Sequence, residues 1–354
     1  MITTLLSMRP TGWFQLCWSH DVALGAVHTV RAFGEDLVVY RTMSGQALVV
    51  DAYCPHLGAH LGVGGTVVDE CLQCPFHGWR FDVDGVNVFV PYAERPNRAA
   101  RLATRHAVEL NEGIFVWHDA AGRDPLWELP DIFADLFGDD ATADDYYPAA
   151  PFGCLRVDGS IHPQYVVENG IDAGHFLAVH RMGSVPEMDP PVFGEWHYES
   201  VARITFGAGK TATKLTPDGP VPGGIRTHTS GLGVGMACFH GLDTERTRVA
   251  CTPIDDRDSM LFSTTWLPRR DGDNAAVLPP ELEKRVAHAN DQFLRDVPIW
   301  SNLRYTASPK LVASEVVRFT ALRKWAQRFY PTNDQPTTDQ PEIDQPILDR
   351  EVSA

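Results

Sequence analysis

The chain has 354 residues, of which 44% are hydrophobic and 21% are charged, and these values predict a folded protein of two domains rather than a disordered one. The formal net charge of −16 argues against a nucleic-acid partner, because phosphate backbones are bound by surfaces rich in lysine and arginine. The opening MITTLLSMRP lacks a secretory signal, no apolar run is long enough for a membrane span, and the seven cysteines cluster near histidines, so we expect a cytoplasmic protein.

The N-terminal third alternates short apolar strands with turn residues. Strand patterns such as DLVVYRT, ALVVDAY and GIFVWHD recur between Gly12 and about His118, and they predict a small all-β domain over residues 1–118. Residues 119–150 are acidic and contain prolines, so we expect a connector with one short helix.

The rest of the sequence mixes strand and helix patterns. Helices are expected at about 163–181, 279–303 and 314–329, between strands such as YESVARITFGAG and DSMLFSTTWLP. A sheet with a long C-terminal helix makes residues 151–330 an α+β domain. In the segment 331–354 the triplet DQP recurs, and the segment contains six acidic residues and only one basic residue, an arginine. This composition predicts a disordered acidic tail.

The stretch CPHLGAHLGVGGTVVDECLQCPFHGW carries the most specific chemistry of the N-terminal domain. One residue separates Cys54 from His56, and two residues separate Cys74 from His77. Two loops that each offer one thiolate and one imidazole fit a Rieske [2Fe–2S] cluster, in which two histidines replace two cysteines on one of the irons. We therefore expect Cys54, His56, Cys74 and His77 to hold this cluster.

A structural zinc site is the alternative, because Cys71 and Cys74 have a spacing that is common among zinc ligands. The zinc interpretation leaves the CPH and HGW segments unexplained, so Cys71 and His60 are predicted to be bystanders. Ala59 and Phe76 stand where Rieske proteins of respiratory complexes carry an extra pair of cysteines. The loops therefore resemble those of oxygenases or ferredoxins.

The second half contains ENGIDAGHFLAVH, which supplies Asn169, Asp172, His175 and His180. His175 and His180 are five residues apart, so a regular helix would point them about 140° apart. Both imidazoles can reach one metal only if the helix is interrupted or contains a π-type turn between them. Two histidines near an N-terminal Rieske motif indicate a non-haem iron site, which also needs one carboxylate.

The predicted helix at 279–303 offers Asp291 and Asp296 as candidates for that carboxylate. Apolar residues spaced three or four apart form one buried stripe along this helix, and Asp296 falls within the stripe between Phe293 and Trp300. Asp291 falls on the opposite face. A buried carboxylate is costly unless it is paired or binds a metal, so we choose Asp296.

Together these motifs resemble the oxygenase component of the Rieske non-haem iron oxygenases. The segments GWFQLCWS, DAYCPHLGAHLGVGG, ENGIDAGHF, FLRDVPIW and LRKWAQRFY look most like the branch of 3-ketosteroid 9α-hydroxylase and cholesterol 7-desaturase, and the resemblance runs from about Arg9 to Tyr330. It implies a Rieske domain followed by a helix-grip (START-like) catalytic domain, commonly in head-to-tail homotrimers. It also implies a mononuclear Fe(II) bound by His175, His180 and Asp296.

The resemblance further implies that Asp172, next to Asn169 in the N-x-x-D-x-x-H motif, connects the two metal sites. Its carboxylate would contact His175 and also a Rieske histidine, here His77, of a neighbouring chain. The implied activity is a monooxygenase that uses O₂ and electrons from an NAD(P)H-dependent reductase or ferredoxin to hydroxylate, or desaturate, a steroid-like or polycyclic substrate.

Two other functions share some of these motifs. An aromatic-ring dioxygenase or O-demethylase of the same family shares all of them, and a Rieske electron carrier shares the N-terminal ones. The sequence lacks a complete G-x-G-x-x-G motif, and GAGKT at 207–211 lacks a glycine that a phosphate-binding loop needs, so no nucleotide is expected to bind. A group of arginines could attract an acidic electron donor: Arg80, Arg95, Arg98, Arg101 and Arg105.

Overall fold

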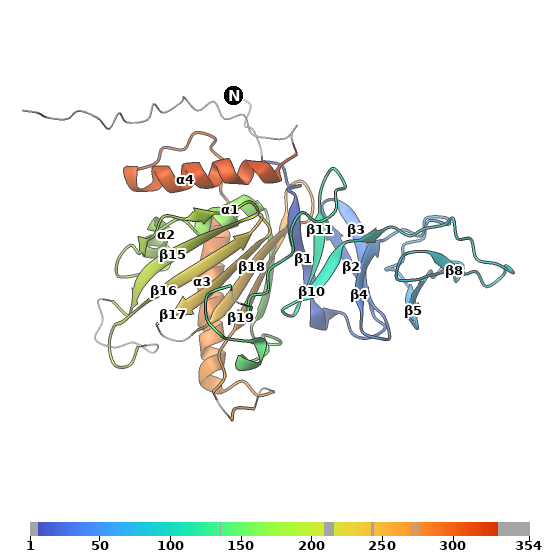
Figure 1. The fold of residues 1–354 in the computed structure, drawn as a ribbon, viewed down its shortest axis with the longest axis horizontal. Coiled ribbons are helices and arrows are strands. Elements are labelled where there is room, and N and C mark those ends of the chain that lie inside the picture. Colours follow the sequence, from blue (N-terminus) through green and yellow to red (C-terminus); the bar gives the residue numbers. More distant parts are fainter. Residues whose placement is uncertain are drawn as a thin grey trace, which may run out of the picture.

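The computed structural model describes residues 6–134, 136–208, 216–241, 244–270, 272–274 and 276–331. Two parts lie side by side, an all-β part at one end and a large sheet with helices at the other (Figure 1). Apart from Pro331, the expected acidic tail lies outside the described residues, as do residues 209–211 of the GAGKT segment.

The N-terminal part consists of three small antiparallel sheets. The first has the strand order β1–β11–β10, the second β2–β3–β4–β9 and the third β5–β6–β7–β8. Alternate residues of β3 serve two cores, since Leu37 and Val39 join one cluster while Val38 and Tyr40 join another. The strand bounds are β1 (Gly12–Trp18), β2 (Val27–Ala32), β3 (Glu35–Arg41), β4 (Ala47–Asp51), β5 (Thr66–Val68), β6 (Cys71–Gln73), β7 (Arg80–Phe81), β8 (Asn87–Phe89), β9 (Thr104–Arg105), β10 (Ala107–Leu110) and β11 (Gly113–His118).

The C-terminal part is built on one antiparallel sheet of eight strands, in the order β12–β19–β18–β17–β16–β15–β13, with β14 also paired to β15. This is the α+β arrangement expected from the sequence. The bounds are β12 (Cys154–Gly159), β13 (Glu187–Met188), β14 (Val192–Phe193), β15 (His197–Phe206), β16 (Val221–Ser230), β17 (Val234–His240), β18 (Arg246–Pro253) and β19 (Ser259–Trp266).

In the described part of the chain, four α-helices accompany this sheet: α1 (Pro163–Asn169), α2 (Gly174–Ala178), α3 (Pro280–Trp300) and α4 (Ala313–Ala326). The long helix α3 crosses the sheet (Figure 1), and Phe293 and Trp300 pack against Cys251 and Leu261 of β18 and β19. Among the described residues, no helix is both long and apolar enough to cross a bilayer.

Two expected helices differ from the structure. The helix expected at 163–181 is interrupted, because α1 ends at Asn169 and α2 begins only at Gly174. The short helix expected in the connector is a single 3-10 turn at Ala143–Asp145. The interruption matters for function, because it separates Asn169 from the segment that carries both histidines.

The largest apolar core spans both parts of the molecule. Phe14 of β1 and Phe115 of β11 belong to the same cluster as Phe262 and Trp266 of β19. Hydrogen bonds cross the same boundary, from the Thr252 hydroxyl to the Gln15 carbonyl at 2.6 Å and from the Phe33 N–H to the Pro253 carbonyl at 2.8 Å. The two parts therefore share one interior.

Candidate metal centres and the cavity beside them

Two similar loops bring Cys54, His56, Cys74 and His77 together at the end of the all-β part. In each loop the cysteine carbonyl accepts a hydrogen bond from a glycine four residues later, Gly58 at 2.9 Å and Gly78 at 3.1 Å. Both glycines have positive φ values, 75° and 69°, which residues with a side chain rarely adopt. The repeated turn explains why two short motifs present one thiol and one imidazole each.

The four side chains fit a [2Fe–2S] cluster of the Rieske type. Cys54 and Cys74 are buried free thiols, and the His56 and His77 ring centroids lie 4.8 Å apart. The His77 Nδ1 atom is buried and has no hydrogen-bond partner among the described residues, as expected for an atom that binds a metal. Burial raises the pKa of the Cys54 thiol to about 11, so loss of its proton depends on a bound cation.

The neighbouring candidates lie outside this arrangement. Cys71 begins strand β6 and pairs with Val68 of β5. The Nδ1 atom of His60 accepts a hydrogen bond from the Gly62 N–H at 3.1 Å. A contact that the sequence did not indicate is the stacking of His56 on Trp79, with 4.1 Å between ring centroids.

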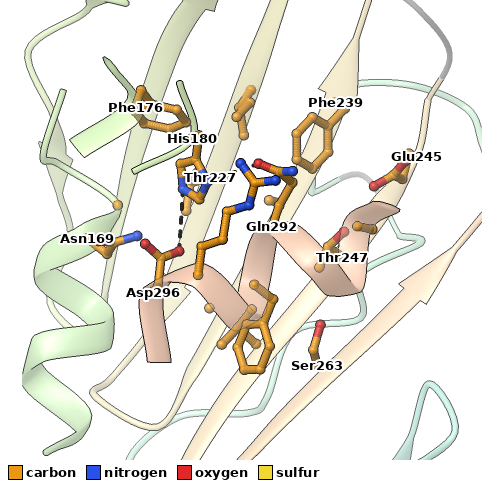
Figure 2. Close-up of a pocket in the computed structure, with 18 of the residues that line it drawn as sticks. Asn169, Phe176, His180, Thr227, Phe239, Glu245, Thr247, Ser263, Gln292 and Asp296 are labelled. Atoms are coloured by element: carbon orange, nitrogen blue, oxygen red, sulfur yellow. Dashed lines mark hydrogen bonds and ion pairs between the residues drawn. The ribbon is translucent and has the colours of Figure 1, made fainter. Parts of the chain in front are cut away.

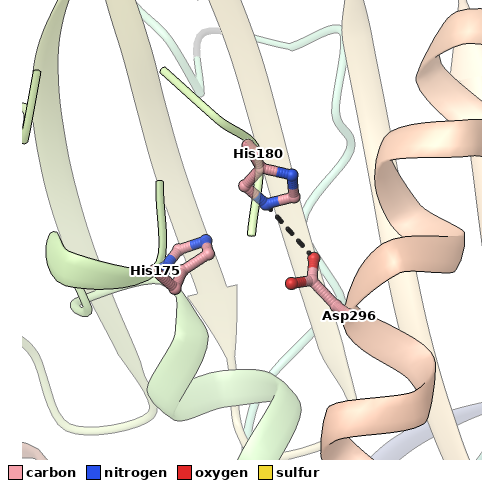
Figure 3. Close-up of side chains that lie close together, drawn as sticks. All are labelled: His175, His180 and Asp296. Carbon is pink, nitrogen blue, oxygen red and sulfur yellow. Dashed lines mark ion pairs between the residues drawn. The ribbon is translucent and has the colours of Figure 1, made fainter. Parts of the chain in front are cut away.

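In the C-terminal part, His175, His180 and Asp296 form a second cluster (Figure 3). One ligand atom from each lies within 4.8 Å of the others, and the His180 Nε2 atom is 3.4 Å from the Asp296 Oδ2 atom. Asp296 is on α3 and only 6% exposed, whereas Asp291 is exposed and pairs with Arg295 at 2.7 Å. Asp296, unlike Asp291, thus lies beside the two histidines.

The chain turns at the end of α2, and this turn brings the two histidines together although they are five residues apart. His175 lies within α2, and His180 lies beyond its last residue, Ala178. The chain turns sharply at Arg181, whose φ is +54°, and the Met182 N–H donates to the Phe176 carbonyl at 3.1 Å. This helix-ending turn brings the two imidazole centroids to 5.0 Å from one another.

Hydrogen bonds orient both imidazoles toward the centre of the cluster. The His175 Nδ1–H donates to the Asp172 carbonyl at 2.6 Å, and the His180 Nδ1–H donates to the Gln292 side-chain carbonyl at 3.2 Å. Each Nε2 atom therefore keeps its lone pair for a metal. Burial lowers the pKa of His175, which favours the neutral imidazole that binds metals.

The remaining two predicted site residues also lie at this cluster. The Asn169 side-chain amide is 3.2 Å from the His175 Nε2 atom. The Asp172 side chain accepts the Gly174 N–H at 2.8 Å and reaches only 4.0 Å from the His175 Nδ1 atom, so its carbonyl makes the closer contact to that ring. Gln292 was missed from the sequence, although its position four residues before Asp296 places it on the same helix face.

Among the residues that the structure describes, the cluster contains two histidines and one carboxylate, which fits a non-haem iron site with open coordination positions. The cluster opens into a cavity of about 1200 Å³ between the sheet and α3 (Figure 2). Apolar side chains line much of this cavity, among them Ile204, Ile225, Ala237, Phe239, Val249 and Phe293. These residues are scattered over five elements, so no local motif reveals them.

Comparisons with known proteins find matches for both parts of the chain. Residues 12–105 match a family model described as the Rieske [2Fe-2S] domain, and residues 116–330 match one described as the 3-ketosteroid 9alpha-hydroxylase C-terminal domain. Cholesterol 7-desaturase nvd of Bombyx mori is 31% identical over 91% of this chain and 69% of that protein. A probable 3-ketosteroid-9-alpha-monooxygenase oxygenase component of Rhodococcus rhodochrous is 31% identical over 90% of this chain and 79% of that protein.

Solved structures show the same fold at lower identity. The crystal structure of dicamba monooxygenase bound to 3,6 dichlorosalicylic acid has a TM-score of 0.68 and 18% identity, covering 92% of this chain and 99% of that one. Pseudomonas putida CBB5 NdmA with caffeine has a TM-score of 0.67 and 18% identity, covering 89% of each chain. At these identities the likeness concerns the fold alone.

Proposed function

This chain belongs to the Rieske non-haem iron oxygenases, in the 3-ketosteroid 9α-hydroxylase family, and from that premise we propose that it oxidises a C–H bond of a steroid. The reaction is a hydroxylation or the related desaturation, since relatives named for each are about equally similar to it. The observation that carries the proposal is the His175–His180–Asp296 cluster at the wall of a large and mainly apolar cavity.

We propose that Cys54, His56, Cys74 and His77 hold the [2Fe–2S] cluster and that His175, His180 and Asp296 hold the mononuclear iron. When bound, these groups supply single electrons and the activation of O₂. The chain's own residues orient the metal ligands and bind the substrate. The Asp172 carbonyl and Gln292 fix the two imidazoles, and the apolar wall binds the substrate and excludes water.

Product analysis tests this function. The iron-loaded protein, with a surrogate reductase and NADH, should convert a steroid to a product that either gains one oxygen atom or loses two hydrogen atoms by mass spectrometry. Hydroxylation consumes O₂, two electrons and two protons and releases one water, whereas desaturation releases two. Turnover of aromatic acids or methyl ethers, with none of steroids, would favour the dioxygenase or O-demethylase alternative.

A separate electron donor is part of the proposal, an NAD(P)H-dependent reductase or a ferredoxin. Among the arginines considered as its docking site, Arg95, Arg98 and Arg101 are exposed. Arg105 contributes less positive charge, because it pairs with Asp51 at 2.5 Å and Glu35 at 2.8 Å.

We also propose a cytoplasmic location, supported by seven free cysteines in the described part of the chain.

A homotrimer in which Asp172 meets His77 of a neighbouring chain remains our proposal for electron transfer. Figure 1 supports it, because the loops near β5 and β8 lie at the opposite end of the molecule from α2. Exposed apolar side chains surround the Rieske loops and could be covered by a neighbour: Leu57, Val63, Phe76 and Tyr92. We also propose that the Rieske domain ends at residue 118, the connector at residue 150 and the catalytic domain at residue 330.

A further inference from the structure

Aromatic side chains form a continuous series from the cavity to the protein surface. Tyr198 of β15 is buried and lines the cavity, and its ring centroid lies 5.5 Å from that of Trp325 on α4. The ring of Phe329 follows, 4.7 Å from Trp325 and 5.9 Å from Trp127. Trp127 in turn stacks on Trp196, with 5.1 Å between centroids and 10° between planes. All of these separations are typical of aromatic rings in contact.

The inner end of this series lies close to the iron cluster. The Tyr198 hydroxyl lies against Gly170 and leaves no room for a side chain at that position. Gly170 directly follows Asn169, whose side-chain amide is 3.2 Å from the His175 Nε2 atom. The Tyr198 ring therefore links Trp325 to the surroundings of a predicted iron ligand.

The outer end of the series reaches water. Trp325 is only 2% exposed and Phe329 is fully buried, whereas the outer pair, Trp127 and Trp196, is half-buried. Trp127 also contacts Trp117 at 4.6 Å, but that ring is buried. Water can therefore meet the series at the outer pair.

Packing alone gives a weak reason for tryptophan at these places. A core needs apolar side chains of suitable volume, and leucine or phenylalanine provides them without an N–H group that needs a partner. The indole N–H of Trp325 donates to the Gly194 carbonyl at 3.0 Å, and that of Trp127 donates to the Ser230 hydroxyl at 2.9 Å. Tryptophan differs from leucine and phenylalanine in that it readily loses one electron. An indole N–H bonded to so weak a base keeps its proton when the ring is oxidised.

We propose that Trp325 and the outer pair carry oxidising equivalents away from the iron site when no substrate C–H bond is present to react. This inference rests on the proposed iron site and adds a protective function to the proposed oxidation. Without such a path, an oxidising equivalent left in the empty cavity would modify the side chains nearest to it, which include the two ligand histidines.

Each transfer moves one electron. Trp325 gives one electron to the oxidised iron site across the Tyr198 ring and becomes a radical cation. The pair of Trp127 and Trp196 returns one electron to Trp325, and Trp196 then releases its indole proton to water. A thiol or ascorbate in solution supplies the electron and the proton that restore the indole. Tyr198 itself keeps its electron, because its hydroxyl donates to the Val167 carbonyl at 2.7 Å, a base too weak to take the proton.

Peroxide treatment without a steroid tests this path through its chemical products. The protein, with ferrous mononuclear iron and an oxidised Rieske cluster, receives hydrogen peroxide, which takes up two electrons and two protons as it forms two waters. Peptide mass spectrometry then locates the side chains that have gained oxygen. Oxidation should concentrate at the outer pair, and it should fall several-fold in protein from which a chelator has removed the mononuclear iron.

Trp325→Phe keeps an aromatic ring but interrupts the path, because phenylalanine is much harder to oxidise. Oxidation of the outer pair should then fall to the level of the iron-free protein, and oxidation of the two ligand histidines should rise. Trp18→Phe is the matched control, since Trp18 contacts the rings of His20 and Phe262 outside this series. It should keep the pattern of the unchanged protein.

If Trp325→Phe does not fold, Trp196→Phe at the half-buried end serves instead, and oxidation should then shift inward to Trp127 and Trp325. Equal oxidation of the outer pair with and without iron overturns the path. An unchanged pattern in Trp325→Phe, or unchanged oxidation of Trp127 and Trp325 in Trp196→Phe, does so too. In all these cases steroid turnover, measured separately, leaves the proposed function standing. If the unchanged protein binds no mononuclear iron, the function and the path are both wrong.

Discussion

Asp296 is a carboxylate on the buried side of a helix, where an isolated negative charge is costly. The His180 Nε2 atom lies 3.4 Å from its carboxylate, and burial disfavours the protonated form of His175. A divalent metal between the three side chains compensates the buried charge without a protonated histidine. The residue is therefore better explained by metal binding than by a histidine–aspartate ion pair.

Asp296→Ala should reduce the iron content from about three to about two atoms per chain, because it removes the carboxylate of the two-histidine, one-carboxylate site. Asp291→Ala changes an exposed carboxylate on the same helix and should retain about three. Iron is measured by mass spectrometry of the purified protein. Iron loss in Asp291→Ala instead would show that the wrong carboxylate was assigned.

Cys74→Ser should abolish the visible absorption of the Rieske cluster, because serine is a poor ligand for a soft iron–sulfur centre. Cys71→Ser, a thiol of β6 three residues away, should leave the absorption unchanged. Equal loss of the visible absorption in both variants would favour the alternative, zinc-like ligand set that includes Cys71.

Gln292→Leu should weaken iron binding about tenfold or more, since residues that orient a ligating histidine commonly contribute that much to metal affinity. The measurement is a chelator competition on the reduced protein, which does not require turnover. Leu294→Ala, on the exposed side of the same helix, is the control and should bind iron normally. Unchanged affinity in Gln292→Leu would mean that its contact with His180 is incidental.

Elements whose pattern is local could be predicted from sequence, and those that depend on distant contacts could not. The helix expected at 279–303 closely matches α3, because its apolar stripe repeats over several turns. The helix expected at 163–181 is wrong as one element, since the positive φ of Arg181 and the break after Asn169 depend on packing around the cavity. For the same reason sequence patterns indicated the three clustered residues but not Gln292.

Strand β18 serves two roles because successive side chains point to opposite faces. Thr247, Val249 and Cys251 line the cavity. Arg246 and Arg248 point the other way and are buried against the connector and the all-β part. Arg246 binds the Ile132 carbonyl and Asp139, and its Nε–H donates to the Tyr146 hydroxyl at 2.9 Å.

Arg246→Met should lower the free energy of unfolding by about 2 kcal/mol, because it leaves a carbonyl and a partly buried carboxylate without their donor. Urea denaturation followed by tryptophan fluorescence measures the change. Arg203→Met removes an exposed pair between Arg203 of β15 and Asp189, and it should cost less than about 1 kcal/mol. Similar losses in the two variants would contradict a stabilising role for the buried contacts.

At the scale of the whole molecule, the loops near β5 and β8 and the helix α2 lie at opposite ends of one chain (Figure 1), so the two candidate metal centres are far apart. The Rieske loops near β5 and β8 point away from the sheet that holds α2 and α3. Electron transfer between the centres of one chain would have to cross the length of the molecule. A neighbouring chain offers a shorter route, which is the basis of the proposed trimer.

Inactive Cys74→Ser chains co-assembled with inactive His175→Ala chains should recover part of the steroid oxidation activity, because some interfaces then pair an intact Rieske centre with an intact iron site. Product formation per iron is the measurement. Unchanged chains taken through the same dissociation and reassembly provide the control. If they survive and the mixture stays inactive, electrons pass within a single chain.

The interior shared by the two parts also governs how such enzymes can be recombined. A cut at 118/119 would expose Phe14 and Phe115 on one fragment and Phe262 and Trp266 on the other. A chimera that takes its electron-transfer half from another oxygenase would therefore have to carry a matching β18–β19 surface, along with the connector that covers Arg246. Exchange of the N-terminal parts between relatives therefore requires that this interface be matched. Chimeras in which the β18–β19 surface does not match the new N-terminal part should be insoluble.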